Sequence, residues 1–419
     1  MKHCITDQKQ KVQADEVMVA VDIGKSLYHV RLSHVGGEPT GVLRVPPNRP
    51  GLDGLWARIR QYQRRWGRDR AVVGFESTGP YGELLVEYCW DKPVRLVQVN
   101  PKHTKRVKEV QDNSPQKSDA KDPRVIATLM ELGSVLSVVA PEGAAAELRR
   151  LMQAREAAVA RQTASGNRMQ QLVFVLFPEL SQVWGKLTTR SGLHLVQHYA
   201  DPAVVRRLGE AGLWAQLRQA RGCRWRRAKV AALVAAAHQS VGVRRGQVAL
   251  QAEVAHLAED LMREQAFLRQ LEARLEAQLA QVPASRYLRS VKGVGRLTAA
   301  GLIGEVGDFG HYATARDLLK LGGLNLYELS SGRHRGQKRI SKRGRALMRK
   351  LLYLAALNVT KPGRAFYEAY QRMLQRGMDK TKAHVAIARK LLQLLFALVR
   401  DQQMYRADYS ARLKKEDAA

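Results

Sequence analysis

The stretch "EVMVAVDIG" (Glu16 to Gly24) decides the first part of the fold, because it is a run of strand-forming residues that ends in an acidic residue and a glycine. "LYHVRLSHV" and "TGVLRVP" follow with turn residues between the runs, which predicts a three-strand meander. Next come a helical stretch from about Gly51 to Trp66, the strand "AVVGFE" (Ala71 to Glu76), a helix opened by Pro80 and the strand "VRLVQV" (Val94 to Val99). Strands followed by alternating helix and strand are typical of an α/β layer fold.

The pattern becomes helical from about Glu142, with breaks expected near Gly166, Pro178 and Gly192. The clearest periodicity is a heptad seam in which the polar Glu264 fills one skipped position. Its apolar members are Val254, Leu257, Leu261, Leu268, Leu271 and Leu275. Such a seam predicts either a hairpin within the chain or a dimer contact, and the pattern favours neither over the other.

The last part opens with "SVKGVGRLTAAGLIGEVGDF" (Ser290 to Phe309), in which Gly293 and Gly295 precede a helix. This spacing resembles the hairpin of helix-hairpin-helix modules, whose backbone N–H groups at a helix start accept a phosphate. The alternative is a pair of packing glycines at a helix entry. A loop rich in Gly, Ser and basic residues follows over 321–344, and two or three helices then extend to about Gln402.

The charge of the chain indicates a polyanionic partner. The 419 residues include 70 Lys and Arg against 38 Asp and Glu, a formal net charge of +32, which is typical of a nucleic-acid-binding protein. A protein of a membrane surface or of the ribosome is the alternative. Cys4, Cys89 and Cys223 form no CxxC pair, which argues against a disulfide framework or a zinc ribbon. No apolar run has membrane-spanning length, so we expect a soluble protein in a reducing cytoplasm, without a membrane partner.

Acidic residues recur at the ends of predicted strands. Asp22 ends the first strand, Glu76 ends the fourth, and Asp119 and Asp122 follow a loop that opens a helix. In an open α/β sheet such ends converge on a crevice. Carboxylate oxygens are ligands for Mg²⁺ or Mn²⁺, and two such ions can clamp the attacking and leaving oxygens of a phosphodiester. A cluster of carboxylates repels DNA unless a cation lies between the carboxylates and the phosphates. The cluster therefore predicts a metal site.

Each of these carboxylates also has a simpler interpretation. Asp122 precedes Pro123 at a first helical position and could be a helix N-cap, although capping does not explain Asp119. "VDIGK", which contains Asp22, also resembles the first phosphate loop of the sugar-kinase and actin ATPases, but their second strand pair and Gly-Gly adenosine loop do not follow. Glu76 could be an ordinary carboxylate at a sheet edge.

Two further features lie in the middle of the chain. "RQARGCRWRRAK" (218–229) predicts either a solvated helix face or a phosphate-binding surface with one stacking aromatic. The nucleic-acid-binding candidates in it are Arg224, Trp225, Arg226 and Arg227. In "HLVQH", His194 and His198 have the i, i+4 spacing that suits a metal on a helix, but no acidic third ligand lies nearby in the sequence.

The motifs "VDIGKS", "FESTGPY", "VNPKHTKRVK" with "KSDAKDPRVIA", "VKGVG" and "GGLNLYELSSG…GQKRISKRG" occur in this order. Over about residues 16–135 and 286–400 they resemble the DEDD transposases of the insertion-sequence one-hundred-and-ten family. The resemblance implies a RuvC/RNase H-like α/β domain, a coiled-coil segment and a C-terminal transposase domain. It implies Asp22, Glu76, Asp119 and Asp122 as catalytic ligands of Mg²⁺ or Mn²⁺. Counted along the Ser-Gly step, the catalytic serine is Ser331, with Ser330 as the alternative one position away.

The activity that the resemblance implies is strand exchange between donor and target DNA by a homo-oligomer, a dimer or tetramer, guided by a structured bridge RNA. Ser331 would attack a phosphodiester and form a phosphoserine link. Basic side chains after the serine would hold phosphates, and their alternative role is a solvated basic loop. These side chains are Arg333, Arg335, Lys338, Arg339, Lys342 and Arg343. Lys25 is a further nucleic-acid-binding candidate.

We therefore expect a leader (1–15) and a tail (404–419) that are disordered, a RuvC-like domain (16–140), a helical and coiled-coil region with a basic insertion (141–283), and a mainly helical C-terminal domain (284–403). The expected function is that of a transposase near the prokaryotic nucleoid. One alternative is a metal-dependent junction nuclease of the RuvC type that uses only the carboxylates and water. Another is a non-catalytic, basic nucleic-acid-binding protein.

Overall fold

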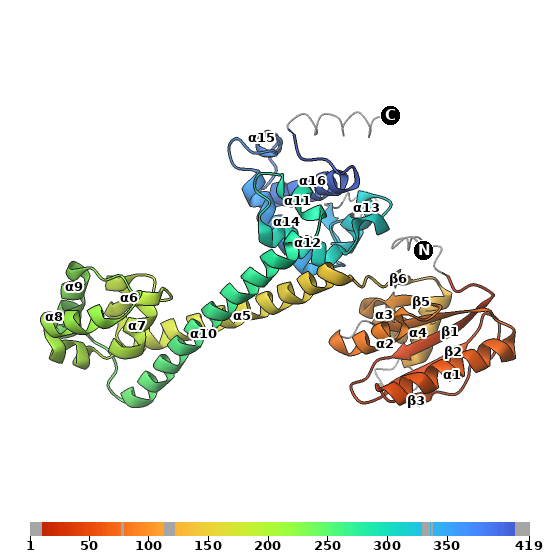
Figure 1. Cartoon of the computed structure of the whole chain (residues 1–419), viewed down its shortest axis with the longest axis horizontal. Coiled ribbons are helices and arrows are strands. Elements are labelled where there is room, and N and C mark those ends of the chain that lie inside the picture. Colours follow the sequence, from red (N-terminus) through yellow and green to blue (C-terminus); the bar gives the residue numbers. More distant parts are fainter. Residues whose placement is uncertain (1–10, 77–78, 113–121, 329–335, 337, 407–419) are drawn as a thin grey trace. The chain divides into compact units, whose positions relative to one another are not determined.

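The computed structural model of the chain, shown in Figure 1, describes residues 11–76, 79–112, 122–328, 336 and 338–406. The chain divides into two compact units. The first takes the residues up to Pro141 together with those from Val306 on, and the second is Glu142–Glu305. Across the described ranges, no helix is both long enough and apolar enough to cross a membrane.

The N-terminal part of the first unit is built on a six-stranded sheet of order β3-β2-β1-β4-β5-β6. β1, β4 and β5 are parallel to one another, while β2, β3 and β6 run antiparallel to their neighbours. The predicted meander and the two following strands are thereby confirmed, whereas β6 has only three residues and no pattern that predicts it. The strands are β1 (Glu16–Asp22), β2 (Tyr28–Ser33), β3 (Leu43–Val45), β4 (Arg70–Glu76), β5 (Val94–Val99) and β6 (Val135–Ser137).

Helices cover both faces of this sheet (Figure 1). Along β1, Val17, Val19 and Val21 pack with α1 and α2, whereas Met18 and Ala20 pack with α4. This division follows from the alternation of side chains along a strand. The helix expected at Pro80 begins as a 3₁₀ turn. The elements are α1 (Arg49–Trp66), the 3₁₀ turn η1 (Gly79–Gly82), α2 (Glu83–Trp90), α3 (Pro101–Asp112) and α4 (Asp122–Glu131).

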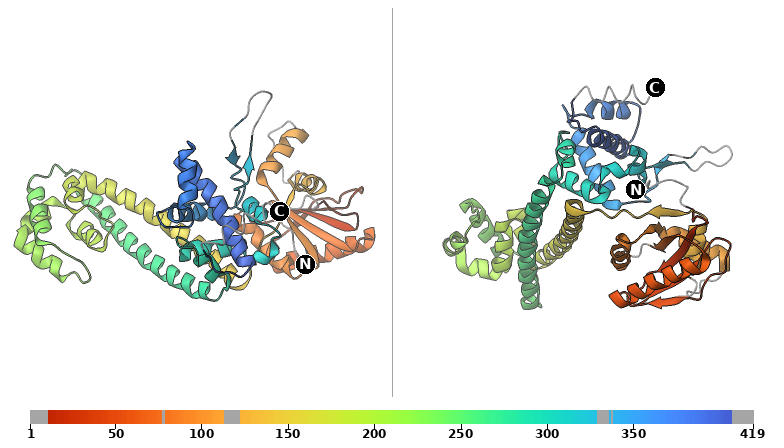
Figure 2. Two further views of the ribbon diagram at one scale, coloured as in Figure 1. Left: turned by 90° about the horizontal axis from the view of Figure 1, so that it is seen from above. Right: turned by 45° about the vertical axis from the view of Figure 1, so that its right-hand side comes forward.

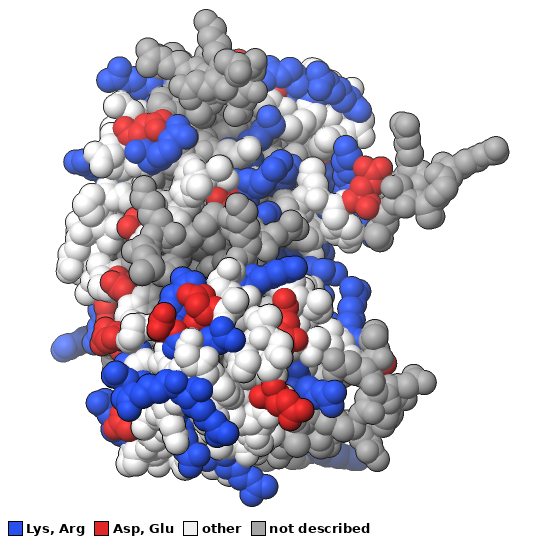
Figure 3. Space-filling view, turned by 90° about the vertical axis from the view of Figure 1, so that its right-hand side faces the viewer, with Lys and Arg blue, Asp and Glu red and all other residues white. Residues whose placement is uncertain are grey.

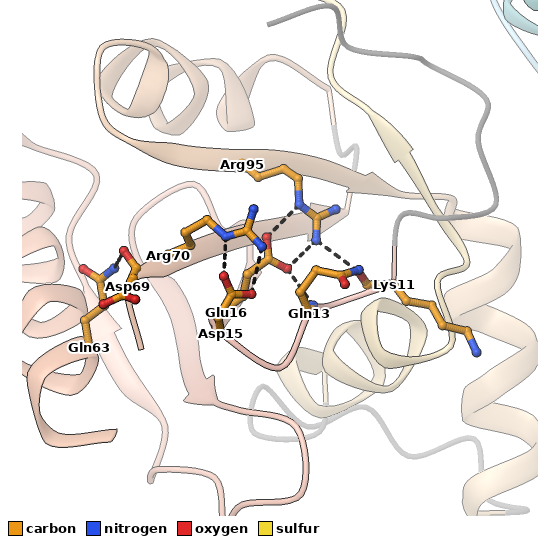
Figure 4. Close-up of polar contacts among 8 residues, drawn as sticks. All are labelled: Lys11, Gln13, Asp15, Glu16, Gln63, Asp69, Arg70 and Arg95. Carbon is orange, nitrogen blue, oxygen red and sulfur yellow. Dashed lines mark hydrogen bonds and ion pairs between the residues drawn. The ribbon is translucent and has the colours of Figure 1, made fainter. Parts of the chain in front are cut away.

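Ion pairs fasten the sheet at the edge where the parallel strands begin (Figure 4). The Glu16 carboxylate is buried and accepts hydrogen bonds from Arg95 Nη2 at 2.7 Å and from Gln13 N at 2.8 Å. Arg70 donates two hydrogen bonds to the exposed Asp15, at 2.6 and 2.8 Å. Residues 11–15, which the sequence assigns to a disordered leader, thus contact the sheet, and Val12 is buried in its core.

We expect Glu16→Gln to lower the free energy of unfolding by about 2 kcal/mol, because it leaves the Arg95 guanidinium without its counter-charge at a nearly buried position. Chemical denaturation followed by circular dichroism measures the change. Asp15→Asn is the matched control, since it removes a carboxylate of the same network that water already solvates, and its effect should be smaller. Equal shifts for the two variants would contradict the assigned role of burial.

The second unit is organised around two helices of 34 residues each, α5 (Gly143–Leu176) and α10 (Gln247–Ala280). They lie side by side in both views of Figure 2. Three ion pairs join them in antiparallel order: Arg155 with Glu272, Arg161 with Glu264, and Arg168 with Glu253. The heptad seam therefore packs against a helix of the same chain, which agrees with the predicted hairpin. The polar seam residue Glu264 pairs with Arg161 of α5.

The break predicted near Gly166 is wrong. α5 continues through this residue, which is buried within van der Waals reach of Leu261 and Thr188. A Cβ at this position would lie 3.7 Å from Thr188 and 3.9 Å from Leu261, which is ordinary van der Waals contact, so this packing does not require glycine. The low helix propensity of a single glycine does not end a helix whose neighbouring turns are buried. The breaks near Pro178 and Gly192 are confirmed, because α5 ends before Pro178 and a new helix begins two residues before Gly192.

A helical lobe lies between α5 and α10 in the sequence. Its buried residues, such as Leu193 and Leu233, form one core with Leu172 and Val173 of α5 and Leu261 of α10. The lobe and the neighbouring ends of α5 and α10 are thus one folded body. The lobe contains α6 (Pro178–Trp184), α7 (Arg190–Tyr199), α8 (Pro202–Gln219) and α9 (Arg227–His238), and α11 (Ala284–Arg289) and α12 (Arg296–Val306) follow α10.

The C-terminal part of the first unit is mainly helical, as predicted. Its core centres on α16, whose Leu391, Leu392 and Leu395 are fully buried. A short β-hairpin precedes the three final helices, which confirms their predicted number. The elements are η2 (Phe309–His311), α13 (Ala315–Leu321), β7 (Leu326–Tyr327), β8 (Arg339–Ile340), α14 (Ala346–Val359), α15 (Tyr367–Gln375) and α16 (Lys380–Arg400). Most of the predicted tail, residues 407–419, lies outside the described residues.

Candidate active site

Two of the predicted carboxylates end neighbouring strands. Val21 of β1 pairs with Phe75 of β4 in a parallel register, so the next residues, Asp22 and Glu76, stand side by side where the strands end. Adjacent strands lie roughly 4.8 Å apart. Both residues are half-buried. The expectation that the ends of β1 and β4 converge is thus met for this pair.

The same two residues belong to the face of the sheet that α4 covers. Met18 and Ala20 of β1 and Val72 of β4 pack against α4, and Asp22 and Glu76 continue this alternation toward the carboxyl ends of the strands. Asp122 is the first residue of α4. The sheet and this helix therefore supply three of the four predicted ligands on one side of the domain.

Glycine allows α4 to approach the sheet closely at β4. A Cβ at Gly74 would lie 2.3 Å from Sδ of the fully buried Met130, so the Met130 side chain would have to shift. Gly74 lies two residues before Glu76 and on the same face. The glycine in "AVVGFE" is thus explained by the packing of the helix that begins at Asp122.

The fourth predicted ligand, Asp119, lies outside the described residues. Within the described part of the chain, no group of three or more His, Cys, Asp or Glu side chains is placed to hold a metal ion. Asp22, Glu76 and Asp122 therefore do not complete a metal site by themselves. Their chemistry nevertheless fits a hard divalent cation, because carboxylate oxygens are the ligands that Mg²⁺ and Mn²⁺ prefer.

Two residues of this face are not singled out by the sequence patterns. His29 of β2 pairs with Asp22 across the antiparallel ladder, and Arg31 pairs with Ala20. Both point away from Tyr28, Val30 and Leu32, which pack on the opposite face. The Nε atom of Arg31 is buried and has no hydrogen-bond partner in the described structure. The alternation of β2, read together with its pairing to β1, is the signal that identifies them.

Lys25, three residues after Asp22, is exposed. Figure 3 shows one face of the molecule, on which Lys and Arg side chains are spread with Asp and Glu between them. The positive charge drawn there does not gather into a single patch.

The predicted serine loop is fixed at its base. Arg349 Nη1 donates to the carbonyl oxygens of Gly322 and Gly344, both at 2.9 Å, and thereby bridges the two ends of segment 322–344. Arg389 Nε donates to Leu324 O at 2.8 Å. Burial lowers the pKa of both guanidinium groups, which remain protonated at neutral pH. A Cβ at Gly344 would lie 2.3 Å from the Leu321 carbonyl oxygen, so this close approach requires glycine.

The remaining catalytic and basic candidates fall between β7 and β8 in the sequence. Ser330, Ser331, Arg333 and Arg335 lie outside the described residues. β7 and β8 pair through Leu326 with Ile340 and Tyr327 with Arg339. Four basic candidates are described and exposed on the returning strand and beyond it: Lys338, Arg339, Lys342 and Arg343. Only Lys338 among them has an ion-pair partner in the described structure, Glu328 at 4.0 Å.

We expect Arg349→Met to lower the rate of the reaction carried out at this loop by roughly tenfold, because two carbonyl oxygens lose one shared donor. Limited proteolysis should also cut segment 322–344 faster, which reports on loop positioning independently of activity. Arg376→Met is the matched control, since Arg376 is exposed on the same unit. Unchanged proteolysis and unchanged activity in Arg349→Met would show that the bridge does not position the loop.

The glycines predicted to form a hairpin precede α12. Gly293 has φ +115, a backbone conformation that favours glycine, and Gly295 immediately precedes the helix. α11 precedes this turn and α12 follows it, which agrees with the predicted hairpin between two helices. Whether its N–H groups bind a phosphate stays a prediction.

The nucleic-acid-binding candidates predicted in 218–229 differ in their surroundings from what the sequence predicts. Arg224 and Arg226 are exposed in the loop before α9, so the alternative of a helix face does not apply to them. The Trp225 ring lies 5.5 Å from that of Trp184 and packs against the core of the lobe, which is unlike a free stacking platform. Arg227 pairs with Glu210 at 3.2 Å.

His194 and His198 of α7 lie next to each other and to other aromatic rings. Their ring centroids are 4.6 Å apart, and the His194 ring lies 5.8 Å from Trp225. Burial, followed by the neighbouring His198, lowers the pKa of His194. Neither histidine belongs to a metal-binding group within the described ranges.

Two segments of the chain match the profiles of known families. Residues 19–178 match a family described as "Transposase", and residues 285–371 match the "Transposase IS116/IS110/IS902 family". The first segment includes all four predicted carboxylates, and the second includes the hairpin glycines and the serine loop. The lobe residues between them belong to neither match.

Similar proteins come from bacterial insertion elements. An uncharacterised 43.6 kDa protein of insertion element IS110 from Streptomyces coelicolor is 26% identical over 392 residues, which cover 93% of this chain and 95% of the relative. An uncharacterised 44.8 kDa protein of IS116 from Streptomyces clavuligerus is 26% identical over 396 residues, covering 93% and 96%. The pilin gene-inverting protein of Moraxella bovis is 31% identical over 122 residues, covering 28% and 37%.

Proposed function

Because this chain belongs to the IS110 family of DEDD transposases, we propose that it recombines donor and target DNA through a phosphoserine intermediate, at a site completed by metal-bound carboxylates. The chain is a transposase of an insertion element by its family. The observation that best supports the proposed chemistry is the pairing of Asp22 and Glu76 at the ends of β1 and β4, on the face covered by α4. The strand order and the mixed strand directions support a RuvC/RNase H-like domain.

The carboxylates have a defined role in this proposal. Asp22, Glu76, Asp119 and Asp122 would hold Mg²⁺ or Mn²⁺ through their oxygens. The bound cations would polarise the phosphodiester and neutralise charge that develops on its oxygens. Without them, two neighbouring carboxylates would repel the phosphate, while Lys25 beside Asp22 would draw it in.

Ser331 is the proposed nucleophile. Its Oγ would form a bond to phosphorus, the bond from phosphorus to one deoxyribose oxygen would break, and the departing oxygen would take up a proton. Attack by the freed hydroxyl of another strand would reverse this sequence and release the serine. Arg339, Lys342 and Arg343 would hold flanking phosphates and spread the charge of the transition state.

Binding partners follow from the charge and the family. We propose that donor and target DNA and a structured bridge RNA bind this chain, which has a net charge of +32. A homo-oligomer, a dimer or tetramer, would bring the serine loop of one protomer to the carboxylates of another. Action on chromosomal DNA would place it at the bacterial nucleoid, in the cytoplasm.

One alternative is supported by a specific observation: Asp22 and Glu76 are brought side by side by the pairing of β1 with β4. A metal-dependent junction nuclease would use only the four carboxylates, Asp22, Glu76, Asp119 and Asp122, and water. Incubation of the purified protein with Mg²⁺, flanking RNA and both DNAs, followed by a denaturing gel, separates the two functions. DNA attached to protein supports the recombinase, and cleavage without attachment supports the nuclease.

A further inference from the structure

An open pocket of about 520 Å³ lies in the helical lobe, where α7 begins and the loop before α9 passes. Its polar lining comes from six residues: Thr189, Arg190, Ser191, Arg224, Arg226 and Lys229. Four of these carry a positive charge, and its lining includes no carboxylate. The pocket therefore brings several positive charges together in a concave site. A flat surface with the same residues would concentrate the positive potential less.

The cations of this pocket are not neutralised by the protein. Within the described residues, Arg190, Arg224 and Arg226 have no ion-pair partner, whereas the neighbouring Arg227 is paired with Glu210. The chain contains no Asp or Glu between Glu210 and Glu253. Uncompensated guanidinium groups in a cavity are typical of a site for an anion.

The walls of the pocket are held in place by hydrogen bonds. Ser191 Oγ accepts from Arg224 N at 2.9 Å, which ties the loop to the first turn of α7. Thr189 caps the same helix, because its Oγ1 accepts from Gly192 N at 3.1 Å. Lys229 Nζ donates to Trp184 O at 3.1 Å and lies 5.2 Å from the centre of that ring.

The start of α7 adds to the positive potential. α7 begins at this pocket, and the dipole of a helix favours an anion at its N-terminal end. The loop reaches this end through Gly222, which has φ +72 and lies against the Arg190 guanidinium. Side-chain cations, a helix terminus and a fixed loop thus converge on one place.

We propose that this pocket binds the phosphodiester backbone of a nucleic acid. The inference rests on the proposed function, which supplies RNA and DNA as ligands, and it adds a binding site far in sequence from the carboxylates and the serine loop. The volume leaves room for a nucleotide unit around the bound phosphate. Trp225 stabilises the site from within the lobe, and the contacts to nucleic acid come from Arg190, Arg224 and Arg226.

The test compares two double variants of the full chain. Arg224→Ala/Arg226→Ala removes two pocket cations, and Arg244→Ala/Arg245→Ala removes two exposed cations from another loop of the second unit. Fluorescence anisotropy with a labelled single-stranded RNA, the DNA of the same sequence and its duplex measures the dissociation constants over a range of salt. Thermal melting by circular dichroism checks that both variants fold like the wild type.

We expect the pocket variant to bind at least one probe about tenfold more weakly and to reduce the salt slope of its affinity by about 1, while the control changes less than about threefold. Weakening with RNA alone identifies RNA as the ligand, weakening with DNA alone identifies DNA, and weakening with both shows a site for either backbone. Equal behaviour of the two double variants with every probe would overturn the proposal.

These outcomes are separable from those of the proposed recombination. Weakened binding of the pocket variant in a protein that never joins DNA would uphold the pocket and reject the phosphoserine mechanism. Normal strand exchange by the wild type, with no difference between the two double variants in binding, would reject the pocket and leave the mechanism standing.

Discussion

Ser331→Ala is expected to abolish the covalent attachment of DNA to the protein and to lower strand exchange by at least about 1,000-fold, because no other group replaces the attacking oxygen. The measurement is a denaturing gel of the reaction with Mg²⁺, in which attached DNA migrates with the protein. RNA and DNA binding should remain close to that of the wild type, since the exchange removes a single hydroxyl group.

Ser330→Ala is the matched control for this experiment, because it makes the same change one position earlier. It should retain the adduct and most of the strand exchange. Loss of the adduct in Ser330→Ala and its retention in Ser331→Ala would move the nucleophile by one residue. Cleavage that continues in both variants without any adduct would favour the junction nuclease.

Asp22→Asn should reduce DNA cleavage and strand exchange by at least about 1,000-fold while nucleic-acid binding stays within about threefold of the wild type. The substitution keeps the size of the side chain but removes the negative charge that a divalent cation requires of its ligand. Glu76→Gln at the end of the neighbouring strand should behave in the same way. Product formation with Mg²⁺ and with Mn²⁺, together with a separate binding titration, measures both effects.

Asp91→Asn serves as the control for the carboxylate variants. Asp91 is an exposed residue of the same domain at the C-terminal end of α2, away from the strand ends. Its replacement should leave cleavage unchanged. An equal loss of binding and of cleavage in Asp22→Asn would mean that this residue stabilises the fold and has no separate part in the chemistry.

Strand pattern and strand direction explain why much of the sheet was predictable. The apolar runs of β1 and β4 are buried on both faces, and such continuous runs are recognisable in a sequence, whereas β5 is half-buried and only Val97 and Val99 in it are buried. The side-by-side ends of β1 and β4 then follow from the parallel order. The short β6 is only partly buried and gives no comparable signal.

Other features depend on contacts that no local pattern encodes. Gly166 is expected to break the helix because glycine has a low helix propensity, yet α5 continues through it, since the buried residues of its neighbouring turns outweigh the cost of one glycine. His29 gains its place beside Asp22 only through the register of two antiparallel strands. The pocket in the lobe joins Arg190 to Arg224 and Arg226, which are more than thirty residues away, so the basic run alone does not reveal a cavity.

The shared core of the lobe and the hairpin has a mechanical consequence. A helix of 34 residues is about 50 Å long, and the three ion pairs along α5 and α10 resist sliding of one helix against the other. Because Leu172, Val173 and Leu261 belong to the core of the lobe as well as to the hairpin, the lobe cannot pivot on a soft joint. The lobe and the hairpin of α5 and α10 are therefore expected to move as one rigid body. A force that a bound nucleic-acid strand exerts on the lobe would then also act on the opposite end of the hairpin.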